Sequence, residues 1–370
     1  MEMKLRKLLA MSVGCAALLA DPAMAQDPAD SQIASEGEVV EGAPFTVTRD
    51  WGTFTLNDRI AEKVRNKQEI NYVFSYQASG IPLFSPQYAA GHTMGCAMGQ
   101  AIYPMTCTAI APVQNDPNMQ VSQIEALLAT DSIDCMGIQP VSSDAMTAIT
   151  NKLMDAGIPV FTAGVTSNGH EFTNFTQTPL LEGDFAAKTV LQWMKDTGKT
   201  DIRVFAVSGG DPTQFWAQGR MKGFQDAIMA AIPDATFVTT AENGLNTSYE
   251  PGRTFDTYRS FLIANPSVQF IQNVDIGAEH ANRAIDSLGL VGSIYTIGWN
   301  SSKAQLDGIE SGVQAALFDQ RWPDQAAFGG PACAQFFANG AILPNSQTLK
   351  AVLAADVETA RAELDRVLGE

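Results

Sequence analysis

Short apolar runs alternate with longer segments of helical periodicity along most of this chain. The runs have the length of buried strands, and the segments between them repeat apolar residues every three or four positions, as helices do. Strands are predicted at 70–76, 105–113, 135–141, 158–164, 203–210, 236–242, 268–274 and 293–299, with helices between them. Such alternation is typical of parallel sheets covered by helices on both faces.

The alternation restarts after a polar loop, so we expect an α/β protein with two doubly wound parallel-sheet domains. In open sheets of this kind, ligands bind beyond the carboxyl ends of the strands. Two such domains facing each other would therefore hold a ligand between them. After the last predicted strand, the chain is expected to end in mixed helix and loop.

The segments outside this pattern are more polar. Residues 26–50 are acidic and low in aromatics, which predicts an extended or disordered lead-in. Residues 55–68 predict a surface helix with Asn57 or Asp58 as its N-cap. The helix that ends in "KLMDAG" is expected to be C-capped by Gly157.

The first 25 residues predict a secretory signal peptide. A basic "MEMKLRK" start precedes an apolar run at 8–20, and Ala-Met-Ala at 23–25 suits a signal peptidase. The mature protein is then expected to be secreted and soluble and to begin near Gln26. A buried N-terminal helix is one alternative. A lipid anchor at Cys15 is another, although Cys15 lies inside the apolar run.

The chain is strongly acidic. The predicted leader carries three basic and two acidic residues, so its removal changes the formal net charge from −17 to −18. A surface of this charge repels nucleic acid and anionic membranes, and no nucleic-acid partner is expected. The length that remains is large for one core and also suggests two domains.

Four cysteines follow the leader: Cys96, Cys107, Cys135 and Cys333. A secreted protein can keep disulfides. Cys96 and Cys107 form the most plausible pair, because a helix end and the next strand start lie between them; four buried thiols remain the alternative. No C-x-x-C and no His-Cys cluster is present, which argues against structural zinc.

The chain has no recognisable catalytic or cofactor motif. It contains no G-x-G-x-x-G, no phosphate-binding G-x-x-x-x-G-K-[ST] and no G-x-S-x-G, and its three histidines have no supporting motif. Neither a cofactor nor an enzyme is therefore expected. The ends of the predicted strands instead carry aromatic, amide and single charged residues: Gln77, Phe84, Gln177, Trp216, Arg220, Asp275, Asn300 and Gln320.

These residue types suit a hydroxylated ligand. Aromatic faces pack against the C–H faces of sugars, and amides, Arg and Asp form directional hydrogen bonds to hydroxyls. Taken singly, each residue also has an ordinary structural interpretation. Trp216 could be a core residue, Arg220 a solvated helix charge and Asp275 a helix cap.

Four stretches carry a family resemblance: "QVSQIEALLATDSIDCMGIQPVSSDAMTAITNKLMDAGIPVFT", "GRMKGFQDAI", "NPSVQFIQNVDIGAEHANRAIDSLG" and "IYTIGWNSSKAQLDGIESGVQAALFDQRWPDQAAFGG". With them the chain resembles the type I periplasmic binding proteins, the ribose-binding-protein-like receptors of ABC sugar importers, over residues 68–345. The resemblance implies a non-catalytic monomer that captures a sugar or polyol and delivers it to an ABC transporter permease in the inner membrane.

The resemblance also implies two domains joined by three crossovers that close on one ligand. We expect an N-terminal extension at 26–67, an N-terminal lobe from 68–174 plus 321–340, and a C-terminal lobe from 175–320 plus 341–370. Hinges are expected near 172–176, 298–302 and 319–323.

By the same resemblance, Phe84 offers a stacking face and Gln77 a hydrogen-bonding group. Arg220, three residues before Gly223-Phe224, falls where the family has a ligand-binding arginine, and Asp275 and Gln320 match its polar strand-end and crossover positions. Arg220 and Asp275 are expected to be cleft residues, with little part in folding.

Two positions depart from the family. The family often has an Asp at the end of the "PVFT" strand, where this chain has Gly164. The family also has an Asp after a Gly-Phe pair, where this chain has Asn300. These departures weaken the case for ribose or a typical hexopyranose. A different sugar, a polyol or another small oxygen-rich ligand fits as well.

Three other classes of protein compete with an importer receptor. A sensory receptor presenting its ligand to a membrane kinase differs little in sequence. A ligand-responsive transcription regulator shares the fold, but the leader and the absence of a basic helix-turn-helix argue against it. A secreted hydrolase would need a catalytic motif that the chain lacks.

Overall fold

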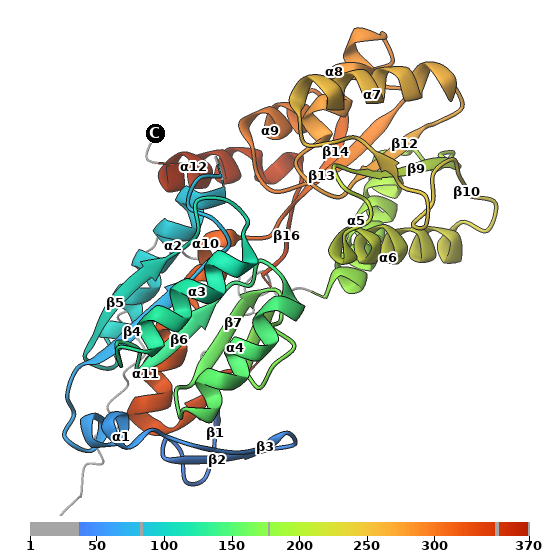
Figure 1. Ribbon diagram of the computed structural model, residues 1–370. Helices are drawn as coiled ribbons and strands as arrows, with labels where there is room; N and C mark the ends of the chain where they lie inside the picture. The colour runs from blue at the N-terminus through green and yellow to red at the C-terminus, as the bar shows by residue number, and fades with distance from the viewer. Residues whose placement is uncertain (1–36, 82–83, 177, 345–347, 369–370) are drawn as a thin grey trace, which may run out of the picture.

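The computed structural model describes residues 37–81, 84–176, 178–344 and 348–368. Figure 1 shows two α/β lobes, with the segments β14, β16 and α12 lying at their junction. The predicted fold class is confirmed.

The first lobe is built on a parallel sheet that has, within the described residues, the strand order β5-β4-β6-β7-β8. These strands are β4 (Ile70–Ser75), β5 (Met105–Ile110), β6 (Cys135–Ile138), β7 (Val160–Gly164) and β8 (Thr173–Thr176). Its helices are α2 (Phe84–Gln100), α10 (Trp322–Ala327) and α11 (Gly329–Asn339), which pack together, and α3 (Pro117–Leu128) and α4 (Ser143–Asp155), which pair with each other. Because helices cover both faces, the central strands are continuous apolar runs.

The second lobe has the strand order β10-β9-β12-β13-β14-β16 within the described residues, with β11 also paired to β9. The strands are β9 (Val204–Gly209), β10 (Thr236–Phe237), β11 (Leu245–Asn246), β12 (Phe270–Asn273), β13 (Tyr295–Trp299), β14 (Gln314–Asp319) and β16 (Lys350–Val352). Its helices are α5 (Pro179–Asp196), α6 (Phe215–Ala231), α7 (Pro251–Ala264), α8 (Ala278–Ser287), α9 (Lys303–Glu310) and α12 (Val357–Leu368). The strands are parallel except β16, which runs antiparallel to β14.

Glycine lets two pairs of helices approach closely. On α2, a Cβ added at Gly91 or Gly95 would collide with the backbone of α10. Between α5 and α6, a Cβ at Gly183 would meet the carbonyl of Arg220, and one at Gly223 would meet that of Leu180. These contacts bring Arg220 on α6 next to the start of α5.

The N-terminal extension is more ordered than its composition predicts. β1 (Glu38–Val39) pairs with β15 (Ala341–Ile342), and β2 (Thr46–Arg49) forms a hairpin with β3 (Gly52–Thr55). Val47 and Phe54 are buried in the first-lobe core, and Phe54 contacts the rings of Phe172 and Phe336. A disordered lead-in is therefore wrong for residues 37–50, because partners far along the chain bury its apolar face.

Helix α1 (Asp58–Arg65) anchors this extension to the first lobe. Asn57 is its N-cap, as predicted, and accepts from the Arg59 backbone N–H at 3.0 Å. Arg59 and Lys63 both pair with the buried Asp134 carboxylate, Lys63 at 2.7 Å. At the end of α4, Gly157 follows the C-cap residue Ala156 with φ +74°, a conformation that glycine adopts without strain.

Three crossovers join the lobes. The chain passes from β8 to α5, from β14 to α10, and from β15 to β16. The hinge expected at 298–302 is wrong, because β13 and β14 are parallel neighbours in one sheet. The third crossover instead lies between Ile342 and Lys350.

Other local predictions also need correction. The strand predicted at 236–242 is only Thr236–Phe237, followed by a separate strand at Leu245–Asn246. The terminal region predicted as mixed helix and loop contains β14 and β16, which complete the second sheet.

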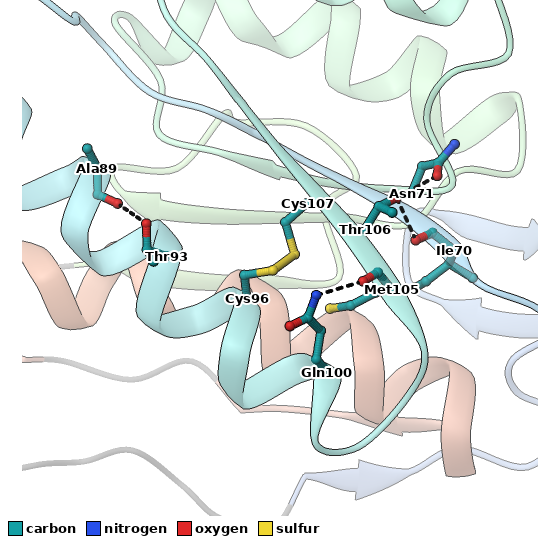
Figure 2. Close-up of a disulfide and its surroundings, with 9 residues drawn as sticks. All are labelled: Ile70, Asn71, Ala89, Thr93, Cys96, Gln100, Met105, Thr106 and Cys107. Carbon is teal, nitrogen blue, oxygen red and sulfur yellow. Dashed lines mark hydrogen bonds between the residues drawn. A yellow bond between two sulfur atoms is a disulfide. The ribbon is translucent and has the colours of Figure 1, made fainter.

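Two disulfides tie the first lobe together. The predicted Cys96–Cys107 bond joins the end of α2 to β5 (Figure 2). A second bond, Cys135–Cys333, joins β6 to α11 across 198 residues and lies in the core. The alternative of four free thiols is therefore wrong. In the described residues, no helix is both long and apolar enough to cross a membrane.

Candidate ligand-binding site

In the second lobe, Asp275 organises the loops that follow β9 and β12. Its Oδ2 accepts from the Gly210 N–H at 2.6 Å and its Oδ1 from the Gly277 N–H at 2.8 Å. The residue is only 6% exposed, and burial raises the pKa of its carboxyl against the opposing effect of these hydrogen bonds. Asp275 therefore shapes the strand-end loops and is not the open cleft residue that was expected.

Arg220 is also buried, with 3% of its surface exposed. Its Nε donates to Glu182 Oε2 at 2.6 Å, and its Nη1 donates to the Val274 carbonyl at 2.8 Å. Burial raises the pKa of Glu182, and the Arg220 charge acts in the opposite direction. The expectation that Arg220 has little part in folding is wrong, because its removal would leave a buried carboxylate without this partner.

Two tryptophans flank the Arg220 guanidinium. Its carbon lies 5.1 Å from the centre of the Trp216 ring and 5.2 Å from that of Trp299, within the range of cation–π attraction. Trp216 is half-buried at the start of α6, whereas Trp299 ends β13 and is fully buried. The guanidinium thus links the partly exposed Trp216 ring to the buried Trp299 ring.

Asn300 follows β13 in a left-handed conformation, with φ +66°. Its N–H donates to the Phe318 carbonyl at 2.8 Å, and its carbonyl accepts from Gln305 Nε2 at 2.9 Å. The side chain is 7% exposed, and among the described residues neither Asn300 Oδ1 nor the neighbouring Trp299 Nε1 has a hydrogen-bond partner. One acceptor and one donor therefore remain unused at this strand end.

Tyr249 adds an exposed aromatic ring to the same lobe. Its ring lies against Gly210, where a side chain would collide with it, and more than half of its surface is exposed. Burial of its hydroxyl and the nearby Asp275 carboxylate raise the pKa of Tyr249.

The first lobe presents amides and aromatics at its strand ends. Gln77 donates its backbone N–H to Gln139 Oε1 at 2.9 Å and its side-chain Nε2 to the Pro140 carbonyl at 2.7 Å. Gly164, with φ +73°, lies where a Cβ would be 3.1 Å from Gln139 Cγ and 3.3 Å from the Tyr88 hydroxyl. A side chain at this position would therefore crowd Gln139 and Tyr88, and glycine adopts the left-handed backbone without strain.

Phe84 is the first residue of α2 and is largely buried. Its ring centre lies 4.6 Å from that of Tyr88 and 5.1 Å from that of Trp322, the latter edge-on. Phe84 therefore belongs to an aromatic cluster that reaches from the first lobe to the second crossover.

Gln320 lies in that crossover. Its Oε1 accepts from Trp322 Nε1 at 2.8 Å, and its carbonyl accepts from Thr348 Oγ1 at 2.6 Å and from Gln325 Nε2 at 2.9 Å. Tyr88 donates to Gln325 Oε1 at 2.7 Å, which links this network to the first lobe. Gln177 lies outside the described residues.

The predicted residues thus form two groups. Trp216, Arg220, Asp275 and Asn300 surround the carboxyl ends of the second sheet, and Gln77, Phe84 and Gln320 lie on the first lobe and the second crossover. Sequence reasoning missed several neighbours: Tyr88, Gln139, Glu182, Tyr249, Trp299 and Trp322. Trp299 ends a predicted strand and could have been chosen by position, but Glu182 lies within a helix and has no such signal.

The chemistry of these groups is that of binding. They offer aromatic faces, amide donors and acceptors, and the Asp275 carboxylate, whose charge is stabilised by hydrogen bonds from backbone N–H groups. No group of metal-ligating side chains occurs among the described residues. Of the described histidines, His92 packs on Phe74 and His170 stacks on Trp51. His280 lies beside Glu279 and close enough to Asp275 for that carboxylate to act on its pKa.

Two lobes, each with a doubly wound parallel sheet, and three crossovers are the architecture of the type I periplasmic binding proteins. A family model described as "Periplasmic binding protein domain" matches residues 74–336, more than half of the chain. The chain therefore belongs to this family, as the sequence resemblance predicted. No curated protein sequence matches it significantly.

Solved structures of this fold are similar over most of the chain. AraP, an arabinose binding protein from Geobacillus stearothermophilus, is 18% identical with a TM-score of 0.64, covering 78% of this chain and 98% of its own. A myo-inositol binding protein from Caulobacter is 18% identical with a TM-score of 0.63, covering 81% and 97%. A solute binding protein from Actinobacillus succinogenes with bound D-allose is 18% identical with a TM-score of 0.64, covering 78% and 99%.

Proposed function

We propose that this protein is a periplasmic solute-binding protein that captures a sugar or polyol between its lobes and delivers it to an ABC importer. One observation carries the proposal: each lobe has a group of aromatic and amide residues at the carboxyl ends of its parallel strands, and three crossovers join the two lobes. Ligands of open α/β sheets bind at such ends. The arabinose, inositol and allose proteins of the same fold support the same ligand class.

The ligand hydroxyls are assigned to the unused polar atoms. Asn300 Oδ1 accepts from one hydroxyl, whereas Trp299 is fully buried and is left out of the assignment. Trp216 supplies a stacking face, with Arg220 and Asp275 holding it and its loop in place. Phe84, Gln77 and Gln320 act from the first lobe and the crossover, and Gln177 is kept as a fourth ligand residue from the sequence alone.

The absence of both family carboxylates shapes the choice of ligand. Gly164 and Asn300 stand in the places of these carboxylates, and the Asp275 oxygens already accept from backbone N–H groups. The site therefore binds hydroxyls through neutral groups. This favours a ligand other than ribose or a common hexopyranose.

The remaining assignments follow from this role. Cleavage between Ala25 and Gln26 releases the protein into the periplasm, where it works as a monomer with an inner-membrane permease and without a cofactor. The extension at 26–67 precedes an N-terminal lobe that starts at 68 and a C-terminal lobe. The expected bounds of the N-terminal lobe are extended through β8 and through β15, because β8 pairs with β7 and β15 pairs with β1. Intact mass of periplasmic protein tests the cleavage, and a mature form that starts at a lipidated Cys15 would contradict it.

A thermal-shift screen against sugars and polyols tests the function. A ligand that binds only the native protein raises Tm. At a free ligand concentration of about 100 times Kd, it adds about 2.7 kcal/mol to the free energy of unfolding. At least one pentose, hexose or cyclitol is expected to raise Tm in a saturable way. If no member of a broad panel does so while the protein is folded, the sugar or polyol assignment fails.

A further inference from the structure

The C-terminal helix α12 lies across the junction of the two lobes. It packs on α9 of the second lobe and also contacts α2 of the first. Its apolar residues Val357 and Leu364 are buried in a cluster with residues of α9, β14 and β16. This face fixes α12 to the second lobe.

Ion pairs strengthen that attachment. Arg361 Nη2 lies 2.9 Å from Asp307 Oδ1 and 2.9 Å from Glu310 Oε2, both on α9. Lys303 at the start of α9 lies 3.1 Å from Asp365 Oδ1. When the lobes move relative to each other, α12 is therefore expected to move with the second lobe.

Toward the first lobe, α12 makes a different kind of contact. Glu363 Oε1 lies 3.0 Å from Arg321 Nη2, and Arg321 precedes α10, which packs on α2. Arg321 also pairs with Asp324 on α10, and its own N–H donates to Asp319 Oδ1 at 2.7 Å. The Glu363–Arg321 pair thus links a helix of the second lobe to the start of a first-lobe helix.

Arg321 occupies an unusual position in the backbone. It lies in the second crossover with φ +55°, a conformation that costs a residue with a side chain about 1–2 kcal/mol, and it is nearly fully buried. Such conformations persist where surrounding contacts enforce them, and they concentrate at sites that move or bind. The Asp319, Asp324 and Glu363 carboxylates are the contacts that enforce this one.

A cavity of about 100 Å³ lies beside this ion pair. Its walls include Ala90 and Met94 of α2, Ala360 and Leu364 of α12, and Asp319 at the end of β14. The contact between α12 and the first lobe is therefore incompletely packed. The cavity gives α12 room to shift against α2, and the ion pair spans the gap.

We propose that the Glu363–Arg321 pair is a latch that holds α12 across the second crossover and biases the ligand-free protein toward the lobe arrangement seen here. Breaking the latch leaves α12 fixed to the second lobe but lets the crossover sample other arrangements. This proposal does not depend on which ligand the protein binds, or on whether it binds a sugar.

The test measures the distance between the lobes directly. Nitroxide labels at Ala126→Cys on α3 and Ala230→Cys on α6, both exposed, report the separation by double electron–electron resonance. The cysteines at 96, 107, 135 and 333 are all in disulfides. The labelled protein is prepared without residues 1–25, which contain Cys15, so that only the introduced thiols react. The comparison is between Glu363→Gln and Glu358→Gln, a matched loss of charge at an exposed position of the same helix.

In the ligand-free protein, Glu363→Gln is expected to change the ratio of lobe arrangements about two- to fivefold, the range for a partly exposed ion pair. The distance distribution should broaden or shift, whereas Glu358→Gln should match the parent. A distribution for Glu363→Gln that superposes on the parent overturns the latch. Hydrogen exchange of α12 accompanies the measurement, because a shift caused by melting of α12 would also overturn it.

Discussion

The buried Cys135–Cys333 bond should contribute more to stability than the Cys96–Cys107 bond. A disulfide restricts the unfolded chain in proportion to the logarithm of the loop that it closes. The separations are 198 and 11 residues. The loop-entropy relation then gives about 5 kcal/mol for the first bond and about 3 kcal/mol for the second at 25 °C. Both bonds lie in the first lobe, so one unfolding transition reports both.

The comparison uses two double variants, Cys135→Ala/Cys333→Ala and Cys96→Ala/Cys107→Ala. Scanning calorimetry of each should show the first-lobe transition lowered by about 10–20 °C and about 6–12 °C respectively, at 2–4 °C per kcal/mol for a lobe of this size. The second-lobe transition serves as the internal control. An equal or larger loss for the Cys96/Cys107 variant would refute the argument from loop length.

Three further predictions concern buried polar groups. Arg220→Ala should destabilise the second lobe by about 3–5 kcal/mol, because it removes this ion-pair partner from the buried Glu182; a melting curve like that of the exposed-site control Lys222→Ala would contradict this. Asn300→Gly keeps the left-handed backbone but removes Oδ1, so titration calorimetry should show roughly 2–10-fold weaker ligand binding at nearly unchanged Tm; unchanged affinity would remove Asn300 from the site. Burial lowers the pKa of His92 from 6.5 to about 4. The unfolded chain therefore binds the proton first, and stability that is fully present above pH 6.5 should fall by about 3 kcal/mol as the pH drops through 4. His92→Phe should abolish that part of the acid dependence, and an identical pH profile in the variant would argue against it.

The features that sequence reasoning predicted correctly depend on local pattern. β4, β9 and α4 were predicted because their apolar spacing is set by the helix or strand itself. The hairpin β2–β3 was missed because its strands are short and Val47 and Phe54 are buried by contacts far along the chain. The short antiparallel strand β16 was missed because it pairs with β14 across the second and third crossovers, and a local pattern does not show such a pairing.

The site shows the same division. Residues at strand ends, such as Asp275 and Asn300, could be selected because the fold class places strand ends together. Their partners could not be selected in this way. Glu182 reaches Arg220 only because glycines let α5 and α6 pack closely, and Asp275 is engaged by backbone groups that a sequence pattern does not identify. For the same reason Arg220 was expected to be accessible, whereas the fold buries it.

The central claim, that a sugar or polyol is bound between two lobes that close on it, is tested most directly by small-angle scattering during a titration. The ligand is the compound that raises Tm most in the screen, and hinge closure around a ligand is a common motion of two-lobed receptors. The account predicts that the radius of gyration decreases with ligand and saturates at one equivalent. A scattering profile that stays unchanged at saturation would contradict binding between closing lobes.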